Sequence, residues 1–329
     1  MIFFVIILFN FFFLFFHDFI AKKISLYDHP DNKRKIHINK VPLTGGFLFL
    51  LNIIIYLLFY FVIKDTSPNI FFGFKDLVPT LVFVLSIILL FIIGYIDDKI
   101  KLSVKFRLIF FIIIVLINLI INPELNIFQI RLSFLNLFFI GNYSYFWTLL
   151  CILLFINAFN FFDGINLQSS GLILAISTFF VFKNIYTEFF LVIILANFFF
   201  SYLNYSSKSF LGNNGSYFMP FLLGGLSISA YNNYPEIYAD EIVMLMLVPG
   251  LDLVRLFLQR IINKKNPFYP DKNHLHHYLI RSYSNNKSAI ITQLLIWVPF
   301  LLSQLYGYLF LFILIQIFIY FFLIFKYKN

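Results

Sequence analysis

The sequence contains a single cysteine, Cys151, which lies inside an apolar segment. One cysteine excludes an internal disulfide and any zinc site built from cysteines. A small residue buried among other apolar residues is the simplest interpretation of Cys151. The chain is therefore held together by neither disulfides nor a thiolate metal centre.

Charged residues are also scarce, at 12% of 329 residues, whereas 61% of the residues are hydrophobic. Apolar runs of about 20 residues, the length that spans a bilayer, recur along the whole chain. We therefore predict an all-α polytopic membrane protein with about 10–11 transmembrane helices, forming one integral membrane domain over residues 1–329. Residues 1–16 have no basic start and no small-residue cleavage site, so we expect a first membrane helix and not a cleaved signal.

The hydrophobic runs place the spans approximately, with the tight joins near residues 185 and 308 as the weakest boundaries. The eleven expected spans are 2–21, 43–63, 78–96, 104–122, 144–161, 170–184, 186–203, 216–232, 241–262, 289–307 and 309–325. Residues 126–142 alternate loosely, which predicts a short hairpin or interfacial segment between two spans.

The net charge is +9. In a soluble protein this would suggest nucleic acid as a partner, but in a membrane protein the basic residues set the topology, and we expect no nucleic-acid partner. With the N-terminus outside, twenty lysines and arginines lie inside and four outside. This distribution predicts a cytoplasmic C-terminus and places every cluster of polar residues on the cytoplasmic face.

Two of these clusters are strongly charged. The first loop carries Lys33-Arg34-Lys35 between Pro30 and Pro42, which indicates a phosphate site or ordinary topology charge near anionic lipid. The second is Asp97-Asp98, followed by four cations. Adjacent carboxylates repel each other, so they require either a hard divalent ion or those nearby cations.

The next two clusters are rich in amides. Asn157, Asn160, Asp163 and Asn166 recur every three residues at the end of a span, where they offer oxygen ligands for a metal or a phosphate. For Asn157, an interhelical hydrogen bond is the alternative. The segment Gly212–Ser216 is a glycine-rich turn before a helix, which either binds an anion through its backbone amides or is an ordinary turn.

The fifth cluster consists of residues 249–252, which end at Asp252, followed by Arg255, Arg260 and residues 267–277. Its three histidines are poorly spaced for zinc, because His276 and His277 point in different directions and no thiolate is present. Recognition of nucleotide phosphates or proton handling is the better interpretation, with solvated loop histidines as the alternative.

In this order and on one predicted side, the clusters resemble the polyprenyl-phosphate N-acetylhexosamine-1-phosphate transferases of the MraY/WecA superfamily, and the WecA-like branch in particular. The resemblance runs from about residue 28 to residue 281. The motifs that carry it are Asp28-x-Pro30, Arg34-Lys35-x-His37, Pro42-x-x-Gly45-Gly46, Asp97-Asp98, Asn157-x-x-Asn160-x-x-Asp163-Gly164, Gly212-x-x-Gly215-Ser216 and Pro270-Asp271-x-x-His274-x-His276-His277.

The resemblance implies transfer of a HexNAc-1-phosphate from a UDP-sugar to polyprenyl (undecaprenyl) phosphate in the bacterial plasma membrane, with release of UMP. This would be the initiating step of cell-envelope polysaccharide synthesis. It also implies Mg²⁺, with Mn²⁺ as the alternative ion, and a homodimer.

The resemblance also implies roles for individual residues. Asp97 would be the base, with Asp98 beside it and Asp163 near the nucleotide diphosphate. The metal ligands would be Asn160, Asn213 and Asp98. The residues expected to bind substrate are Arg34, Lys35, His37, Lys105, Arg107, Asn157, Arg255, Arg260, Asp271, His274, His276 and His277.

Two positions depart from the family pattern. The glycine-rich motif usually carries an aspartate where this chain has Asn213, and Asn166 replaces another aspartate, as it does in eukaryotic relatives. An amide oxygen at position 213 still ligates Mg²⁺ but carries no charge. The alternative function is therefore a catalytically impaired family member that acts as a membrane binding or assembly protein. A transporter is disfavoured, because the charged clusters lie at span ends.

Overall fold

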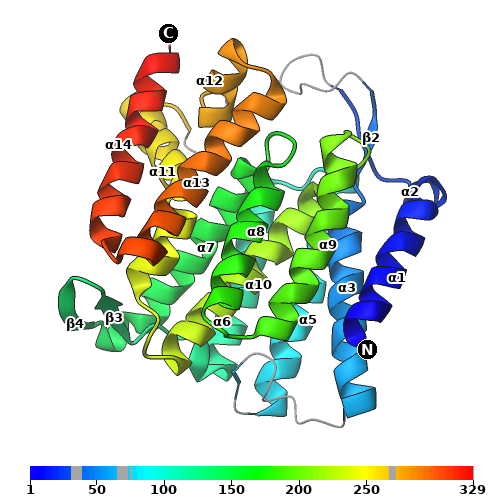
Figure 1. Ribbon diagram of the computed structural model, residues 1–329, viewed down its shortest axis with the longest axis horizontal. Helices are drawn as coiled ribbons and strands as arrows, with labels where there is room; N and C mark the ends of the chain where they lie inside the picture. The colour runs from blue at the N-terminus through cyan, green and yellow to red at the C-terminus, as the bar shows by residue number, and fades with distance from the viewer. Residues whose placement is uncertain (31–38, 65–72, 75, 267–271, 329) are drawn as a thin grey trace.

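The computed structural model describes residues 1–30, 39–64, 73, 74, 76–266 and 272–328 as a bundle of helices (Figure 1). The long helices are α1 (Ile2–Phe15), α3 (Gly45–Phe59), α5 (Leu77–Ile100), α6 (Val104–Ile121), α7 (Ser144–Phe162), α8 (Gln168–Phe182), α9 (Thr187–Tyr205), α10 (Gly212–Asn233), α11 (Ala239–Ile262), α13 (Asn285–Tyr306) and α14 (Leu309–Tyr327). The short elements are α2 (His17–Ile24), a π-helical turn η1 (Tyr60–Lys64), α12 (Leu275–Ser282), the 3₁₀ turns η2 (Pro123–Leu125) and η3 (Gly141–Tyr143), and the strands β1 (Tyr27–Asp28), β2 (Val41–Pro42), β3 (Gln129–Leu132) and β4 (Leu135–Phe139).

The all-α membrane fold predicted from the sequence is confirmed, and each of the eleven expected spans overlaps one of the long helices. The two tight joins do separate helices. Asn184 and Tyr186 adopt positive φ between α8 and α9, and Gly307 does so between α13 and α14. The left-handed backbone conformation ends one helix before the next begins.

Not every long helix qualifies as a span by its own length and composition. Among the described residues, seven helices are long and apolar enough to cross a membrane, or eight if α1 and α2, which bend by 74°, form one span. The helix α8 is apolar but shorter, with 15 residues. The expected count of 10–11 transmembrane helices therefore exceeds the number that pass this criterion.

The core of the bundle surrounds α10, which is buried at every position from Asn214 to Tyr231. It packs against α5, α7 and α3. Because protein and not lipid surrounds it, α10 contains glycine, serine and asparagine that a lipid-facing helix would avoid. This explains why it is absent from the helices that pass the criterion for a span.

The short strands form two separate antiparallel pairs. The pair β1 and β2 is antiparallel, with Tyr27 opposite Pro42. The pair β3 and β4 forms an antiparallel hairpin, which confirms the hairpin expected within residues 126–142. Figure 1 shows β2 and α12 at the end of the bundle where the C-terminus lies, with the N-terminus toward the opposite end.

Contact between α5 and α10 depends on a glycine. A Cβ atom on Gly94 would lie 2.3 Å from the carbonyl oxygen of Asn213 and 2.6 Å from the Cα of Asn214. Both atoms are backbone, so the helices have to separate to accept a methyl group. The glycine therefore sets the distance between the end of α5 and the start of α10.

We predict that Gly94→Ala lowers the free energy of unfolding by about 1–3 kcal/mol, because the added methyl group overpacks this contact. The matched control is Gly250→Ala in α11, where a Cβ meets nothing within 4 Å. That change should be neutral or stabilise by up to about 1 kcal/mol through helix propensity. Denaturant unfolding of the detergent-solubilised variants measures both, and equal effects would contradict the packing role of Gly94.

Candidate active site

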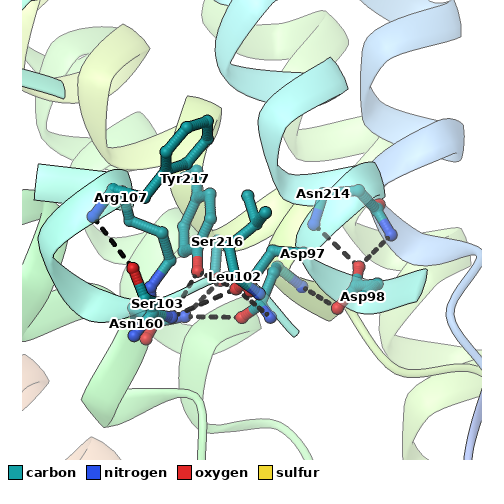
Figure 2. Close-up of polar contacts among 11 residues, drawn as sticks. Asp97, Asp98, Leu102, Ser103, Arg107, Asn160, Asn214, Ser216 and Tyr217 are labelled. Atoms are coloured by element: carbon teal, nitrogen blue, oxygen red, sulfur yellow. Dashed lines mark hydrogen bonds and ion pairs between the residues drawn. The ribbon is translucent and has the colours of Figure 1, made fainter. Parts of the chain in front are cut away.

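Asp98 binds the N-terminus of α10 (Figure 2). Its Oδ1 accepts a hydrogen bond from the backbone amide of Asn213 at 3.0 Å, and its Oδ2 accepts one from the amide of Asn214 at 3.0 Å. The Asn214 side chain donates a third, at 2.8 Å. The first amides of a helix have no partner within the helix and carry partial positive charge, so a carboxylate is well placed there.

Asp97 lies beside this contact, is 4% exposed and faces a different set of donors. Its Oδ2 accepts hydrogen bonds from Arg107 at 3.1 Å, from the Asn213 side chain at 2.9 Å and from the Tyr217 hydroxyl. Its Oδ1 accepts one from the Leu102 amide at 2.6 Å. The two adjacent carboxylates are thus held apart by separate donors, and only Asp97 pairs with a cation among the described residues.

The amides of the third cluster extend this network. Asn160 on α7 donates to the Asn213 Oδ1 at 3.1 Å and to the Ser216 hydroxyl at 2.7 Å. Asn213 in turn donates to Asp97, so one chain of hydrogen bonds links α7, α10 and α5. Asn157 instead donates to the carbonyl of Leu153 in its own helix, at 2.7 Å.

Backbone hydrogen bonds join the first loop to the start of α10. Phe210 donates to the carbonyl of Pro42, while Gly45 donates to Phe210 and Gly46 donates to Leu211, each at 3.0 Å. This pairing brings the Pro42–Gly46 motif against the glycine-rich motif. The predicted phosphate ligands Arg34, Lys35 and His37 of the same loop lie outside the described residues.

The Asp163-Gly164 motif meets the histidine cluster. A Cβ on Gly164 would lie 2.3 Å from Nε2 of His276, so glycine is needed at this close approach. Asp163 is half-buried, and this burial raises the pKa of its carboxyl group to about 6. The hydrogen bond with Ser169 lowers the pKa and offsets part of that rise. Burial also lowers the pKa of His276 well below its usual value, so His276 is neutral at pH 7.

A buried network fixes the histidine cluster in place. The Asp252 carboxylate accepts from His274 Nδ1 at 2.7 Å, from the Leu275 amide at 3.1 Å, from Arg255 at 2.8 Å and from the Tyr320 hydroxyl at 2.8 Å. It therefore joins α11, the start of α12 and α14. The rings of His274 and His276 are stacked, with centroids 5.4 Å apart.

The remaining predicted residues divide by location. Arg107 lies in the carboxylate network, whereas Lys105 is exposed two residues earlier on α6. Arg255 is engaged by Asp252, Tyr320 and the carbonyl of Asn273. Arg260 is buried at 6% exposure, and Asp271 lies outside the described residues.

These contacts place the ends of α5 and α7, the start of α10 and the loop before α3 at one end of the bundle. Residues 80–231 match glycosyl transferase family 4. The match contains the Asp97-Asp98, Asn160 and Asn213 positions, and it confirms the resemblance predicted from the motifs.

Three relatives cover most of the chain. It is 27% identical over 295 residues to the "Probable undecaprenyl-phosphate N-acetylglucosaminyl 1-phosphate transferase" of Bacillus subtilis, covering 87% of this chain and 78% of the relative. It is 28% identical over 280 residues to the undecaprenyl-phosphate alpha-N-acetylglucosaminyl 1-phosphate transferase of Thermotoga maritima, covering 82% and 78%. The Escherichia coli K12 protein of the same name is 26% identical, with 87% and 77% covered.

A preformed metal cage is absent from the described part of the chain, where no group of three or more histidine, cysteine, aspartate or glutamate residues is placed to hold an ion. Mg²⁺ often takes one or two carboxylates together with water and substrate phosphates. The predicted ligands Asp98, Asn160 and Asn213 lie in one hydrogen-bonded network with a single carboxylate among them, which suits this weaker kind of site. Both oxygens of Asp98 accept hydrogen bonds, as do both oxygens of Asp97, so a metal at either carboxylate would replace a donor.

Sequence reasoning missed several residues of the network. Tyr217 contacts Asp97 and also accepts a hydrogen bond from Arg107 at 2.7 Å. Its position four residues after Asn213, on the same helix face, is the signal that would have suggested it. Asp252 belongs to the fifth cluster expected from the sequence, three residues before Arg255, whereas nothing local in the sequence indicates Tyr320.

We predict that Asp252→Ala lowers the free energy of unfolding by about 3–5 kcal/mol, because it leaves the Arg255 guanidinium, whose side chain is only 13% exposed, without its carboxylate. The comparison is Tyr320→Phe, which removes one hydroxyl from the same network and should cost about 1 kcal/mol. Denaturant unfolding in detergent measures both variants. If Asp252→Ala lowers the free energy of unfolding no more than Tyr320→Phe does, the carboxylate does not hold this network.

Proposed function

We propose that the chain transfers a HexNAc-1-phosphate from a UDP-sugar to polyprenyl (undecaprenyl) phosphate and releases UMP, as the initiating step of cell-envelope polysaccharide synthesis. The names of the relatives support an undecaprenyl-phosphate acceptor and transfer of a sugar-1-phosphate. The carrying observation is the meeting of Asp97, Arg107, Asn160 and Asn213 at one end of a membrane bundle.

In the proposed reaction an oxygen of the lipid phosphate attacks the β-phosphorus of the UDP-sugar. A new phosphorus–oxygen bond forms to the lipid phosphate, and the bond from the β-phosphorus to the bridging oxygen breaks, so UMP leaves with that oxygen. The lipid phosphate and the diphosphate of the UDP-sugar together carry several negative charges. The protein's main task is therefore to neutralise charge and align the reactants.

Asp97 is the proposed base for the lipid phosphate. Among the described residues its Oδ1 accepts only the Leu102 amide, which leaves a lone pair for a proton. Arg107 lies against the other oxygen and offers further N–H groups to a phosphate. Asp98 acts by positioning, because it holds the start of α10 and with it Asn213.

The second substrate region is formed by Asp163 and the histidines. The proposed contacts to the diphosphate and nucleotide come from His274, His276 and His277, which Asp252 fixes through His274. The network assigns Arg255 the same positioning role. Lys105, exposed beside Arg107, is a proposed contact to phosphate of either substrate.

We further propose that Mg²⁺, or Mn²⁺ in its place, is held by Asp98, Asn160 and Asn213, the ligands predicted from the motifs, together with substrate phosphate oxygens. When bound, it supplies positive charge to the diphosphate. The proposal also places the protein in the bacterial plasma membrane, with the N-terminus outside and the C-terminus and site in the cytoplasm. This orientation is supported by the distribution of lysine and arginine.

The test incubates the purified full chain in detergent with undecaprenyl phosphate, Mg²⁺ and radiolabelled UDP-GlcNAc or UDP-GalNAc. We expect label to move into the organic phase with equimolar UMP, and chelation by EDTA to abolish the transfer. Asp97→Asn should lower kcat by at least about 100-fold, the usual contribution of a positioned base. Glu236→Gln, an exposed change beyond the opposite end of α10 from the site, is the control and should leave the rate unchanged.

Two outcomes would overturn the proposal. The first is the absence of transfer from every UDP-HexNAc tested, and the second is an Asp97→Asn variant as active as the parent. Activity that appears only in Asn213→Asp would instead support the impaired family member that the departure at position 213 suggests.

A further inference from the structure

A cleft opens on the edge of the bundle between α1 and α9, away from the carboxylates. Its volume is about 940 Å³, and most of its lining comes from residues 11–18 of α1 and α2 and residues 198–203 of α9. The bend of 74° between α1 and α2 lies at its upper end. Figure 1 shows α1 and α2 at this edge of the molecule, beside α9.

The walls of the cleft are aromatic and face outward. Phe11, Phe12 and Phe198 are 58%, 56% and 57% exposed. The helix α9 qualifies as a membrane span, and α1 does so together with α2. A cleft between spans at this depth contacts hydrocarbon and not water, so lipid chains are its natural filling.

The upper rim of the cleft is polar. It includes His17, Asp18 and Lys208. Asp18 is almost fully exposed and lies 3.5 Å from the His17 ring, while Lys208 is exposed at the end of the α9 segment. Lys22 and Lys23 follow on the last turn of α2. Lys208 and Asp18 balance each other in the lining itself, and Lys22 and Lys23 add two positive charges about one turn further along α2.

We propose that this cleft binds one anionic phospholipid of the bilayer, with its acyl chains against the phenylalanines and its phosphate beside Lys208. The apolar walls and the cationic rim match the two parts of such a molecule. The acyl chains of a neutral phospholipid would make the same apolar contacts with the phenylalanines, but its headgroup would have no net attraction to the lysines.

The acceptor of the proposed reaction is a different molecule at a different place. The helix α1 packs on α2, α3 and α9, whereas Asp97 and Arg107 lie on α5 and α6. A lipid phosphate at Lys208 is therefore on another edge of the bundle from the carboxylates. The proposal stands whether or not the transferase activity does.

The rim is nevertheless connected to the start of α10. His17 Nε2 lies 3.0 Å from the Thr44 hydroxyl, and that hydroxyl lies 2.7 Å from the Ser209 hydroxyl. Ser209 directly precedes Phe210, whose backbone pairs with Pro42 and Gly45. A lipid that holds α1 and α2 against α9 therefore also holds the loop that leads into α10, and binding should raise thermal stability.

The experiment titrates the detergent-purified full chain with dioleoyl phosphatidylglycerol or dioleoyl phosphatidylcholine and records bound lipid by native mass spectrometry and Tm by thermal unfolding. Phosphatidylglycerol should bind in a one-to-one complex and raise Tm more than phosphatidylcholine. Lys208→Gln should weaken its binding about fivefold, the effect of one lysine near an anionic surface. Lys265→Gln makes the same charge change away from the cleft and should bind like the parent.

A substitution in the aromatic wall of the cleft provides a second test of lipid binding. Phe198→Ala removes an exposed ring from the cleft without opening the protein core. It should lose bound phosphatidylglycerol as well. Equal binding of both lipids, or parent-like binding by Lys208→Gln and Phe198→Ala, would overturn the proposal. Two further results would also do so: tighter Lys208-dependent binding of farnesyl phosphate than of phosphatidylglycerol, or a dimer dissociated by Phe198→Ala without any lipid effect.

Discussion

The hydrogen bonds from the start of α10 to the Asp98 carboxylate hold the functional end of this protein together. The first amides of a helix have no partner within the helix, and Asn214 at the start of α10 is buried, so these amides need an acceptor from the protein. Asp98 supplies it from the end of α5. The close approach at Gly94 and the backbone pairing of Pro42 with Phe210 then bring three segments of distant sequence to the same point.

This arrangement gives the two adjacent aspartates different environments. Asp98 is neutralised by helix amides, whereas Asp97 faces Arg107, Tyr217 and the Asn213 side chain. Asn213 acts as a donor to Asp97 and as an acceptor from Asn160. A carboxylate at 213 has no hydrogen to donate to Asp97, so it would need a cation between the two groups. The amide thus links α5 to α7 without requiring one.

Much of the architecture could be predicted because it follows from composition and local pattern. Long apolar runs locate the helices, and polar residues at their ends locate Asp97, Asn160 and Asn213. The contacts between those ends could not be predicted. Tyr217 meets Asp97 across 120 residues of sequence, and Arg255 is held by Tyr320 across 65. Periodicity reports which face of a helix a residue shares, but it does not report which other helix lies against that face.

The number of spans also could not be predicted from local sequence pattern alone. The helix α10 lies where a span was expected, but it is enclosed by protein and its polar residues bind other helices. Hydropathy measures affinity for lipid, and it therefore undervalues a helix whose surroundings are protein. The same enclosure is what makes α10 suitable as the support of the site, because its first turn cannot shift without disturbing α3, α5 and α7.

The most direct test of this account is amide hydrogen exchange of the segment 212–216 in the parent and in Asp98→Asn. The account predicts slow exchange of the Asn213 and Asn214 amides in the parent, and exchange at least about tenfold faster in the variant, with the amides of residues 218–231 unchanged. Fast exchange of Asn213 and Asn214 in the parent, or equal rates in both proteins, would contradict the claim that the Asp98 carboxylate holds the start of α10.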